Sequence, residues 1–232
     1  MPSRKGKVAV LVPAAGEGRR LGGRRKQFRL LGGKPLLVQT LLVFERHPAV
    51  HYLLVATPAE AVEPLTIELR GVGVTKLHAV VAGGATRQAS VGLALQAVPP
   101  AVDIVLVHDA VRPFVEPALI SAVIQRVREA GAAALAIPMA DTVRQDVNGC
   151  FGETVPRETL LRMQTPQGFR RDWFEAAHAE AMREGREATD DVELVQHLGY
   201  AVEVIPGNSR NVKITTREDW ELAQALWPRW IA

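Results

Sequence analysis

The 232-residue sequence has few of the residues that mark several large classes of protein. Its single cysteine, Cys150, cannot form an internal disulfide, and no Cys/His spacing typical of a metal site surrounds it. No apolar run reaches the roughly 18 residues that a membrane span needs. The N-terminus passes from charge into a strand pattern without a signal-peptide cleavage region. We therefore predict a cytoplasmic protein that does not enter a membrane.

Aromatic side chains are also scarce, and neither sign of charge is in large excess. Phe, Trp and Tyr make up 5% of the chain, and 28 Lys and Arg residues against 25 Asp and Glu residues give a net charge of +3. Few aromatic side chains are available for stacking on bases, so nucleic acid is disfavoured as a ligand. The small basic excess fits an anionic small molecule or merely a solvated basic surface.

Short apolar runs rich in Val, Ile and Leu are the main feature of the chain. Each is too short for a helix and almost continuously hydrophobic, which is typical of strands buried on both faces. Segments with helical character lie between these runs. We predict one Rossmann-like α/β domain over residues 1–232, with a mainly parallel sheet flanked by helices. The predicted strands are 7–13, 51–57, 76–84, 103–110, 132–139, 201–207 and 211–215, and the predicted helices are 34–47, 57–71, 86–98, 116–131, 172–185, 189–199 and 216–227.

The alternation of strands and helices stops between residues 141 and 166. This segment contains the turn dipeptide Asn148-Gly149, has β-compatible flanks and lacks an apolar helix face. Such a pattern is typical of a β-hairpin. We predict that residues 141–166 form an arm that protrudes from the domain and packs against a partner.

Residues 12–28, VPAAGEGRRLGGRRKQF, form a loop between a predicted strand and a cluster of cations. It is not a Walker loop, because Gly23 is followed by Arg24 where Lys is required. It is not a dinucleotide fingerprint, because Leu21 occupies the third glycine position. Small residues still expose backbone N–H groups, so we predict a cradle for a chain of phosphates. The small residues are Ala14, Ala15, Gly16 and Gly18, and the cations are Arg19, Arg20 and Lys26.

Asp109 ends the predicted strand 103–110, in the sequence LVHDAVRP. Ligands of open α/β sheets bind at the C-terminal ends of the strands. An aspartate there is often only a turn former, but beside a triphosphate it is a candidate Mg²⁺ ligand, because Mg²⁺ takes one or two carboxylates plus substrate phosphates. Lys213 lies in the predicted strand 211–215, where an ammonium group indicates a facing ligand.

The loop at residues 12–28 resembles the signature loop of nucleotidyltransferases that join nucleoside triphosphates to phosphorylated sugars and alcohols. The motifs GGATRQASV, VHDAVRP, DTV, TPQGF, ATDD and RNVKIT follow it in this order. Together they are similar to the 2-C-methyl-D-erythritol 4-phosphate cytidylyltransferase family of the non-mevalonate isoprenoid pathway, over nearly the whole chain. Two positions depart from the family pattern: Ala85 replaces a common acidic residue, and Arg25 precedes Lys26 where proline is usual.

The resemblance implies transfer of a cytidylyl group from CTP to methylerythritol phosphate, with Mg²⁺ as the cofactor and pyrophosphate as the second product. It also implies a homodimer in which the arm reaches into the neighbouring subunit. The implied catalytic residues are Arg20, Lys26 and Lys213. The implied nucleotide contacts are Ala14, Ala15, Gly16, Gly84, Ser90, Asp109 and Ala110, with Asp109 as the metal ligand. The implied acceptor contacts are Arg157, Thr165, Thr189 and Lys213.

Other readings of the sequence stay open. A sister enzyme that uses another alditol phosphate, such as ribitol 5-phosphate, would share the nucleotide half of the site. A non-catalytic nucleotide-binding regulator would need the pocket, but it would have no need of Lys26, Asp109 and Lys213 together. Thr189 also fits the N-cap of the predicted helix 189–199, which would give it a purely structural role.

Overall fold

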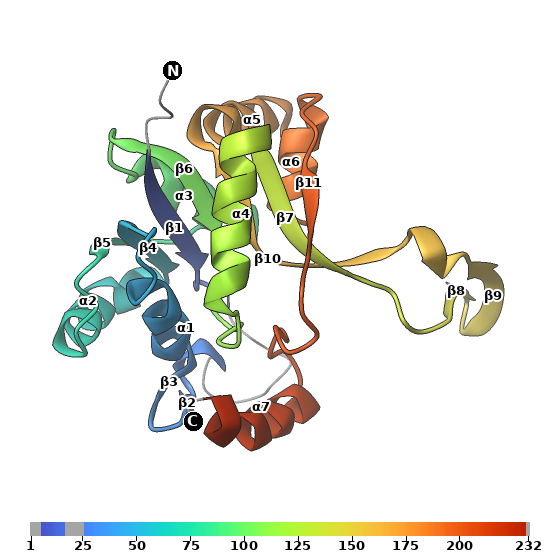
Figure 1. The fold of residues 1–232 in the computed structure, drawn as a ribbon, viewed down its shortest axis with the longest axis horizontal. Helices are drawn as coiled ribbons and strands as arrows, with labels where there is room; N and C mark the ends of the chain where they lie inside the picture. The colour runs from blue at the N-terminus through green and yellow to red at the C-terminus, as the bar shows by residue number, and fades with distance from the viewer. Residues whose placement is uncertain (1–5, 17–25, 231–232) are drawn as a thin grey trace.

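The computed structural model describes residues 6–16 and 26–230. Figure 1 shows a central sheet with helices on both faces. The sheet has seven strands in the order β11-β7-β10-β6-β1-β4-β5, and β10 is antiparallel to its neighbours β6 and β7 while the other pairings are parallel. The strands are β1 (Lys7–Pro13), β4 (Tyr52–Thr57), β5 (Leu77–Ala82), β6 (Val102–Val107), β7 (Ala132–Pro138), β10 (Leu161–Arg170) and β11 (Glu203–Pro206). The predicted mainly parallel α/β sheet is confirmed.

The two faces of the sheet carry separate hydrophobic cores. Alternate residues of β1 divide between them, because Val8 and Val10 pack into one core while Ala9 and Leu11 pack into the other. This alternation explains the near-continuous apolar runs, since both faces of each central strand are covered. The first core is covered by α1 (Leu36–Glu45), α2 (Val62–Gly71) and α4 (Pro117–Ala130), and the second by α3 (Arg87–Gln96), α5 (Arg171–Glu184) and α6 (Asp191–His197).

A third, smaller core joins the C-terminal helix to the segment after the glycine-containing loop. Helix α7 (Arg217–Trp230) packs on the two-stranded ribbon of β2 (Leu30–Leu31) and β3 (Lys34–Pro35), with Phe114 between them. Gly32 lies in this ribbon with a φ of +57°, and a methyl group there would collide with the Trp227 ring. The ribbon therefore needs glycine at this turn, both for its backbone conformation and for close packing.

The predicted hairpin is present as β8 (Val143–Val147) and β9 (Cys150–Val155), and Figure 1 shows it extending away from the main sheet. Asn148 and Gly149 turn the chain with φ values of 53° and 82°, as a two-residue hairpin loop of this sequence requires. After the short 3₁₀ helix η4 (Arg157–Thr159), residues 161–170 return to the main sheet as β10. The C-terminal boundary of the predicted arm was therefore too far along the chain.

One predicted strand does not form. Residues 211–215 were expected to be a strand, but they run as an extended segment outside any sheet and are bound to the loop after β6 by the hydrogen bond from the Ile214 N–H to the Val111 carbonyl. Ile214 is buried in the third core. Ile214 is therefore buried by this contact and not by a strand pairing. Among the described residues, the remaining 3₁₀ helices are η2 (Lys26–Phe28) and η3 (Ala59–Ala61).

Candidate active site

The loops after β1, β5 and β6 meet at the C-terminal edge of the sheet. The loop after β1 begins with Ala14 and Ala15, and the loop after β5 contains Gly83 and Gly84. These two loops are in close contact, because a methyl group added to Gly83 would come within 2.4 Å of the Ala15 Cβ. The small residues therefore let the two backbones approach each other closely at this edge.

Gln27 fixes the start of the loop after β1. Its side chain is buried, and its Nε2 donates to the carbonyl oxygens of Ala14 at 2.7 Å and of Gly16 at 3.0 Å. The neighbouring residue, Lys26, is thereby attached to the start of the loop that was predicted to hold phosphates. Sequence reasoning missed Gln27, although a glutamine beside a small-residue loop is a suitable donor for its carbonyls. The predicted catalytic residue Arg20 lies outside the described residues.

Ser90 fixes the loop after β5. Its hydroxyl donates to the Thr86 carbonyl at 2.9 Å and accepts from the Gly84 N–H at 3.2 Å. Thr86 is the N-cap of α3, since its own hydroxyl accepts from the Ala89 N–H. The buried Ser90 hydroxyl therefore ties Gly84 to the first turn of α3.

Three cations surround the carboxylate of Asp109, which follows the C-terminal end of β6. Its Oδ2 lies 3.1 Å from Lys213 Nζ and 3.2 Å from Arg112 Nε, and its Oδ1 lies 3.4 Å from Arg87 Nε. Burial raises the pKa of Asp109, but attraction by Lys213, Arg87 and Arg112 outweighs burial and holds the pKa well below its usual range. Asp109 is therefore an anion at any physiological pH.

Arg112 connects this carboxylate to the segment that carries Lys213. Its Nη1 donates to the Asn211 carbonyl at 2.7 Å while its Nε contacts Asp109. Asn211 in turn donates from Nδ2 to the Thr165 carbonyl at 2.8 Å. Lys213 was predicted to face a ligand from a strand; the structure pairs its ammonium group with Asp109 and leaves 42% of the side chain exposed.

Thr165 and His108 support Asp109 through hydrogen bonds. The His108 Nε2–H donates to the Arg112 carbonyl, so the neutral ring accepts at Nδ1 from the Thr165 hydroxyl. The same hydroxyl accepts from the Asp109 N–H at 3.1 Å. Thr165 was predicted to lie in the arm; it lies in β10 of the main sheet, buried, and its hydroxyl positions the backbone of Asp109.

The buried ring of His108 predicts a loss of stability in acid. Burial lowers the pKa of His108 from 6.5 to about 4. Between pH 6.5 and 4, His108 is protonated in the unfolded chain but stays largely neutral in the folded chain. The free energy of unfolding should therefore fall as the pH drops through this range. A shift of this size is worth about 2–3 kcal/mol at pH 4.5 relative to pH 7. Urea unfolding of the wild type and of His108→Gln at both pH values measures it. An equal pH effect in both proteins would contradict the assignment.

Arg87 joins two carboxylates. Its Nη1 lies 2.7 Å from Asp191 Oδ2, in addition to the contact of its Nε with Asp109. Burial raises the pKa of Asp191, opposed by the attraction of Arg87. Sequence reasoning missed Asp191, because only the fold brings the start of α6 beside the start of α3.

The hydrogen bonds of Thr189 and Arg157 go to residues outside the cluster of Asp109 and its three cations. The N–H and hydroxyl of the exposed Thr189 both donate to Glu193 Oε2, while Asp190 is the N-cap of α6. The alternative of Thr189 as the N-cap is therefore wrong, although its own bonds support the same helix start. Arg157, in η4 at the base of the arm, donates to the Ala140 carbonyl and is exposed.

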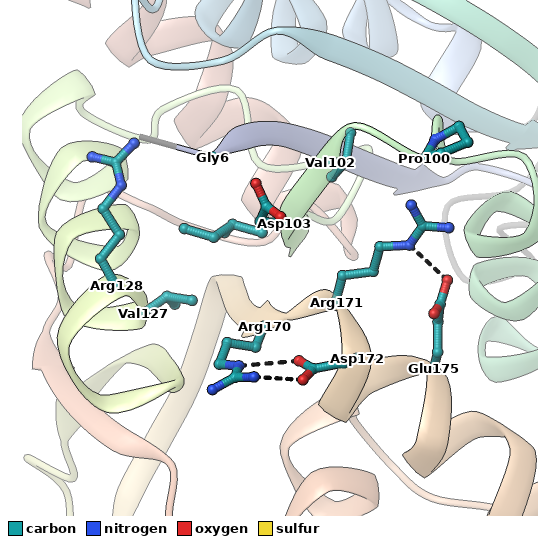
Figure 2. Close-up of a pocket in the computed structure, with 11 residues that line it drawn as sticks. Gly6, Pro100, Val102, Asp103, Val127, Arg128, Arg170, Arg171, Asp172 and Glu175 are labelled. Atoms are coloured by element: carbon teal, nitrogen blue, oxygen red, sulfur yellow. Dashed lines mark hydrogen bonds and ion pairs between the residues drawn. The ribbon is translucent and has the colours of Figure 1, made fainter. Parts of the chain in front are cut away.

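A cavity of about 580 Å³ lies at the opposite, N-terminal end of the strands, beside Gly6 and Asp103. Figure 2 shows that two of its arginines are paired, Arg170 with Asp172 and Arg171 with Glu175. None of the predicted site residues lines it. This cavity is therefore separate from the candidate active site around Asp109.

Asp109 could hold a metal ion only if oxygen atoms of a substrate complete the coordination of that ion. Among the described residues, no three His, Cys, Asp or Glu side chains are grouped closely enough to hold a metal ion. Within residues 6–16 and 26–230, Asp109 Oδ1 has one cationic neighbour at 3.4 Å, whereas Oδ2 has two at shorter distances. One carboxylate with a less engaged oxygen suits Mg²⁺, which is commonly held by one or two carboxylates together with substrate phosphates.

Comparison with known proteins identifies the family of this chain over almost its whole length. Residues 8–229 match the sequence model of the 2-C-methyl-D-erythritol 4-phosphate cytidylyltransferase family. The enzyme of that name from Salinibacter ruber is 60% identical over 223 residues, which cover 96% of this chain and 94% of the relative. The crystal structure of the Thermus thermophilus enzyme of the same name has a TM-score of 0.82 at 39% identity, and covers 96% of this chain and 99% of that one.

The sheet, with Asp109 and the loops after β1 and β5 at its C-terminal edge, matches the fold of a nucleotidyltransferase. A second structure, 4-diphosphocytidyl-2C-methyl-D-erythritolsynthase from Anaerococcus prevotii, has a TM-score of 0.85 at 25% identity and covers 98% of both chains. This chain belongs to the 2-C-methyl-D-erythritol 4-phosphate cytidylyltransferase family. It is therefore an enzyme of the transferase class.

Proposed function

We propose that the site around Asp109 transfers the cytidylyl group of CTP to 2-C-methyl-D-erythritol 4-phosphate, in the non-mevalonate route to isoprenoid precursors. The products are 4-diphosphocytidyl-2-C-methyl-D-erythritol and pyrophosphate. The family match over residues 8–229 is the observation that carries this proposal. The cationic cluster of Lys213, Arg112 and Arg87 at the strand ends supports it, because both substrates are anions.

The chemistry needs positioning and charge more than proton transfer. The acceptor phosphate has a second pKa near 6, so it is largely dianionic at pH 7 and attacks the α-phosphorus of CTP without a strong base. The obstacle is repulsion between two highly charged anions. Fixed cations and backbone N–H groups aimed at the phosphates lower that barrier.

The loops after β1 and β5 are assigned to the nucleotide. Lys26 and Arg20 would contact the triphosphate, together with the backbone at Gly16. The backbone of Ala14, Ala15 and Gly84 and the hydroxyl of Ser90 would read the cytosine. The hydrogen bonds that Gln27 donates to Ala14 and Gly16, and that the Ser90 hydroxyl accepts from Gly84, support this role, since they fix the described parts of these loops. Ala110, whose carbonyl accepts from the Thr40 hydroxyl, would lie against the ribose.

The acceptor is assigned to the side of the site that carries Lys213. Its ammonium group, partly exposed beside Asp109, can donate to a phosphate oxygen while keeping its carboxylate contact. Thr189 and Arg157 are the further proposed contacts. Thr165 was also predicted to contact the acceptor. Its hydroxyl already donates to His108 and accepts from the Asp109 N–H, so the role that we propose for it is to position Asp109.

A divalent cation, which we take to be Mg²⁺, would be held by Asp109 together with the triphosphate oxygens of CTP. When bound, it would withdraw charge from the phosphates and so favour nucleophilic attack. Lys213, Arg112 and Arg87 keep Asp109 ionised and oriented for this purpose.

No helix in the described part of the chain is long and apolar enough to cross a membrane. A cytoplasmic location stays a prediction.

A direct test of the reaction follows the phosphorus atoms. Purified protein with CTP, Mg²⁺ and methylerythritol phosphate should form the cytidine diphosphate ester and pyrophosphate in equal amounts, as measured by ³¹P NMR. The regulator alternative predicts binding of CTP with no pyrophosphate. Release of pyrophosphate without loss of the acceptor would contradict transfer.

The proposed dimer places the arm of one subunit at the site of a second copy. The tip of the arm exposes apolar side chains that a monomer would leave in water, with Phe151 at 90% exposure and Val147 at 51%. Arg157 lies at the base of this arm. A second copy of the chain would cover the apolar tip and bring Arg157 to the partner's acceptor.

Mixing two inactive variants tests the exchange of arms. Homodimers of Lys26→Ala should lose activity through the loop, and those of Arg157→Ala through the arm. In a mixed dimer one site carries both defects and the other carries neither. Random reassortment makes about half the dimers mixed, so about a quarter of all sites should regain activity in an isologous dimer. Proven subunit exchange without recovery would show that Arg157 does not act on the partner.

A further inference from the structure

The guanidinium group of Arg87 contacts two carboxylates at unequal distances. Its Nη1 lies 2.7 Å from Asp191 Oδ2, whereas its Nε lies 3.4 Å from Asp109 Oδ1. Asp109 Oδ2 is engaged at shorter distances by Lys213 and Arg112. The Oδ1 atom of Asp109 is consequently the less engaged of its two oxygens, and the strong partner of Arg87 is Asp191.

Asp191 is held in its position independently of Arg87. It is the first residue of α6, its side chain is 1% exposed, and its N–H donates to Gln167 Oε1. Gln167, in β10, also donates from Nε2 to Asp190 Oδ2, so two contacts attach the start of α6 to the main sheet. Within the described chain, Arg87 is the one cation within 4 Å of Asp191. A buried carboxylate with one partner is costly, which calls for a reason in the function of the site.

A guanidinium group with only one carboxylate nearby tends to bind both of its oxygens through parallel N–H donors. Without Asp191, Arg87 would be free to close on Asp109 in this bidentate manner and cover Oδ1. We propose that Asp191 is a positioning residue that draws the Arg87 guanidinium group towards itself, limits its contact with Asp109 Oδ1 to the 3.4 Å bond from Nε, and so keeps this oxygen available to the divalent cation. The inference rests on the proposed function, in which Asp109 is the protein ligand of that cation.

The test is calorimetry of CTP binding with and without Mg²⁺. In Asp191→Asn, the gain in CTP affinity that Mg²⁺ provides should fall by about 10- to 100-fold, the usual effect of removing an outer partner of a metal ligand. Binding of CTP without Mg²⁺ should change little. Asp190→Asn is the matched control, because it removes a charge from the adjacent residue, which contacts Gln167 and the Glu193 N–H but not Arg87. It should keep the full gain.

A second variant identifies Arg87 as the mediator. In Asp191→Asn with Arg87→Gln, the guanidinium group that would cover Oδ1 is absent, so the Mg²⁺-dependent gain should return to near the wild-type value. The double variant also leaves no unpaired charge in this buried site, so its melting temperature should exceed that of Arg87→Gln alone.

The outcomes separate this inference from the proposed function. If Asp109→Asn keeps the full Mg²⁺-dependent gain, Asp109 does not bind the cation and both proposals fail. If Asp109→Asn loses the gain and Asp191→Asn keeps it, only the role of Asp191 is overturned. An equal loss in Asp191→Asn and in the double variant would also overturn it, because the effect would then not pass through Arg87.

Discussion

Replacing Asp109 with asparagine is expected to remove most of the Mg²⁺-dependent activity. The amide keeps the size and shape of the side chain but loses the charge that a divalent cation requires. The variant also deprives Lys213, Arg112 and Arg87 of their shared anion, so the site becomes more positive. CTP should therefore bind without Mg²⁺ at least as tightly as it binds to the wild type, while the gain in affinity on adding Mg²⁺ is lost.

Calorimetry with and without Mg²⁺ measures both effects of Asp109→Asn. Asp103→Asn is a suitable control, because Asp103 lies on the same strand, β6, but lines the cavity at the opposite end. It should bind CTP and Mg²⁺ as the wild type does. A full Mg²⁺-dependent gain in Asp109→Asn would make Asp109 a structural residue, held by its three cations for stability alone.

Lys26→Ala is expected to lower kcat by roughly 10²–10³, the scale of losing one preorganised charge contact to the transition state. Lys26 begins η2 and is followed by Gln27, whose side chain fixes the carbonyls of Ala14 and Gly16. Because Gln27 rather than Lys26 makes these bonds, the loop should keep its conformation and the melting temperature should change little.

The matched control for Lys26 is Lys34→Ala. Lys34 is an exposed cation in β3, in the ribbon that follows the same loop, and it should be dispensable for turnover. Steady-state measurement of pyrophosphate release gives kcat for the three proteins. Turnover within a few-fold of wild type in a folded Lys26→Ala protein would remove Lys26 from the catalytic residues.

The parts of the fold that follow from apolar pattern were predictable. The strands β1, β4, β5, β6 and β7 are almost continuous apolar runs, because their side chains enter one core or the other on both faces. The turn at Asn148 and Gly149 was predictable for a local reason, since few other residues accept a positive φ there. In the same way, the position of Asp109 at the C-terminal end of a buried strand was predictable, while its role in the site stays a prediction.

Strand β10 could not be predicted in this way. It buries the polar side chains of Gln164, Thr165 and Gln167, which give the sequence MQTPQGF the appearance of a loop. Each is satisfied by a distant residue: Gln164 by Asn208, Thr165 by His108, and Gln167 by Asp190. Hydrophobic periodicity reports burial against a nonpolar core and carries no information about polar partners of this kind.

The same limit explains the missed residues of the site. Gln27 binds carbonyls 11 and 13 residues earlier in the chain, and Asp191 meets Arg87 only after α3 and α6 have packed on the sheet. Lys213 was selected because it was predicted to lie in a strand, but its segment is held by the bonds of Ile214 and Arg112 instead. The predicted strand was wrong, and the role of Lys213 stays a prediction.

The central claim is that the cytidylyl group passes to methylerythritol phosphate, and the most direct measurement compares acceptors. Purified protein with CTP and Mg²⁺ is given methylerythritol phosphate or ribitol 5-phosphate, and kcat/KM is obtained from pyrophosphate release. We predict a preference for methylerythritol phosphate of at least about 10²-fold, because an acceptor that leaves polar groups of the site unpaired is strongly rejected. Equal or greater kcat/KM with ribitol 5-phosphate would contradict the account.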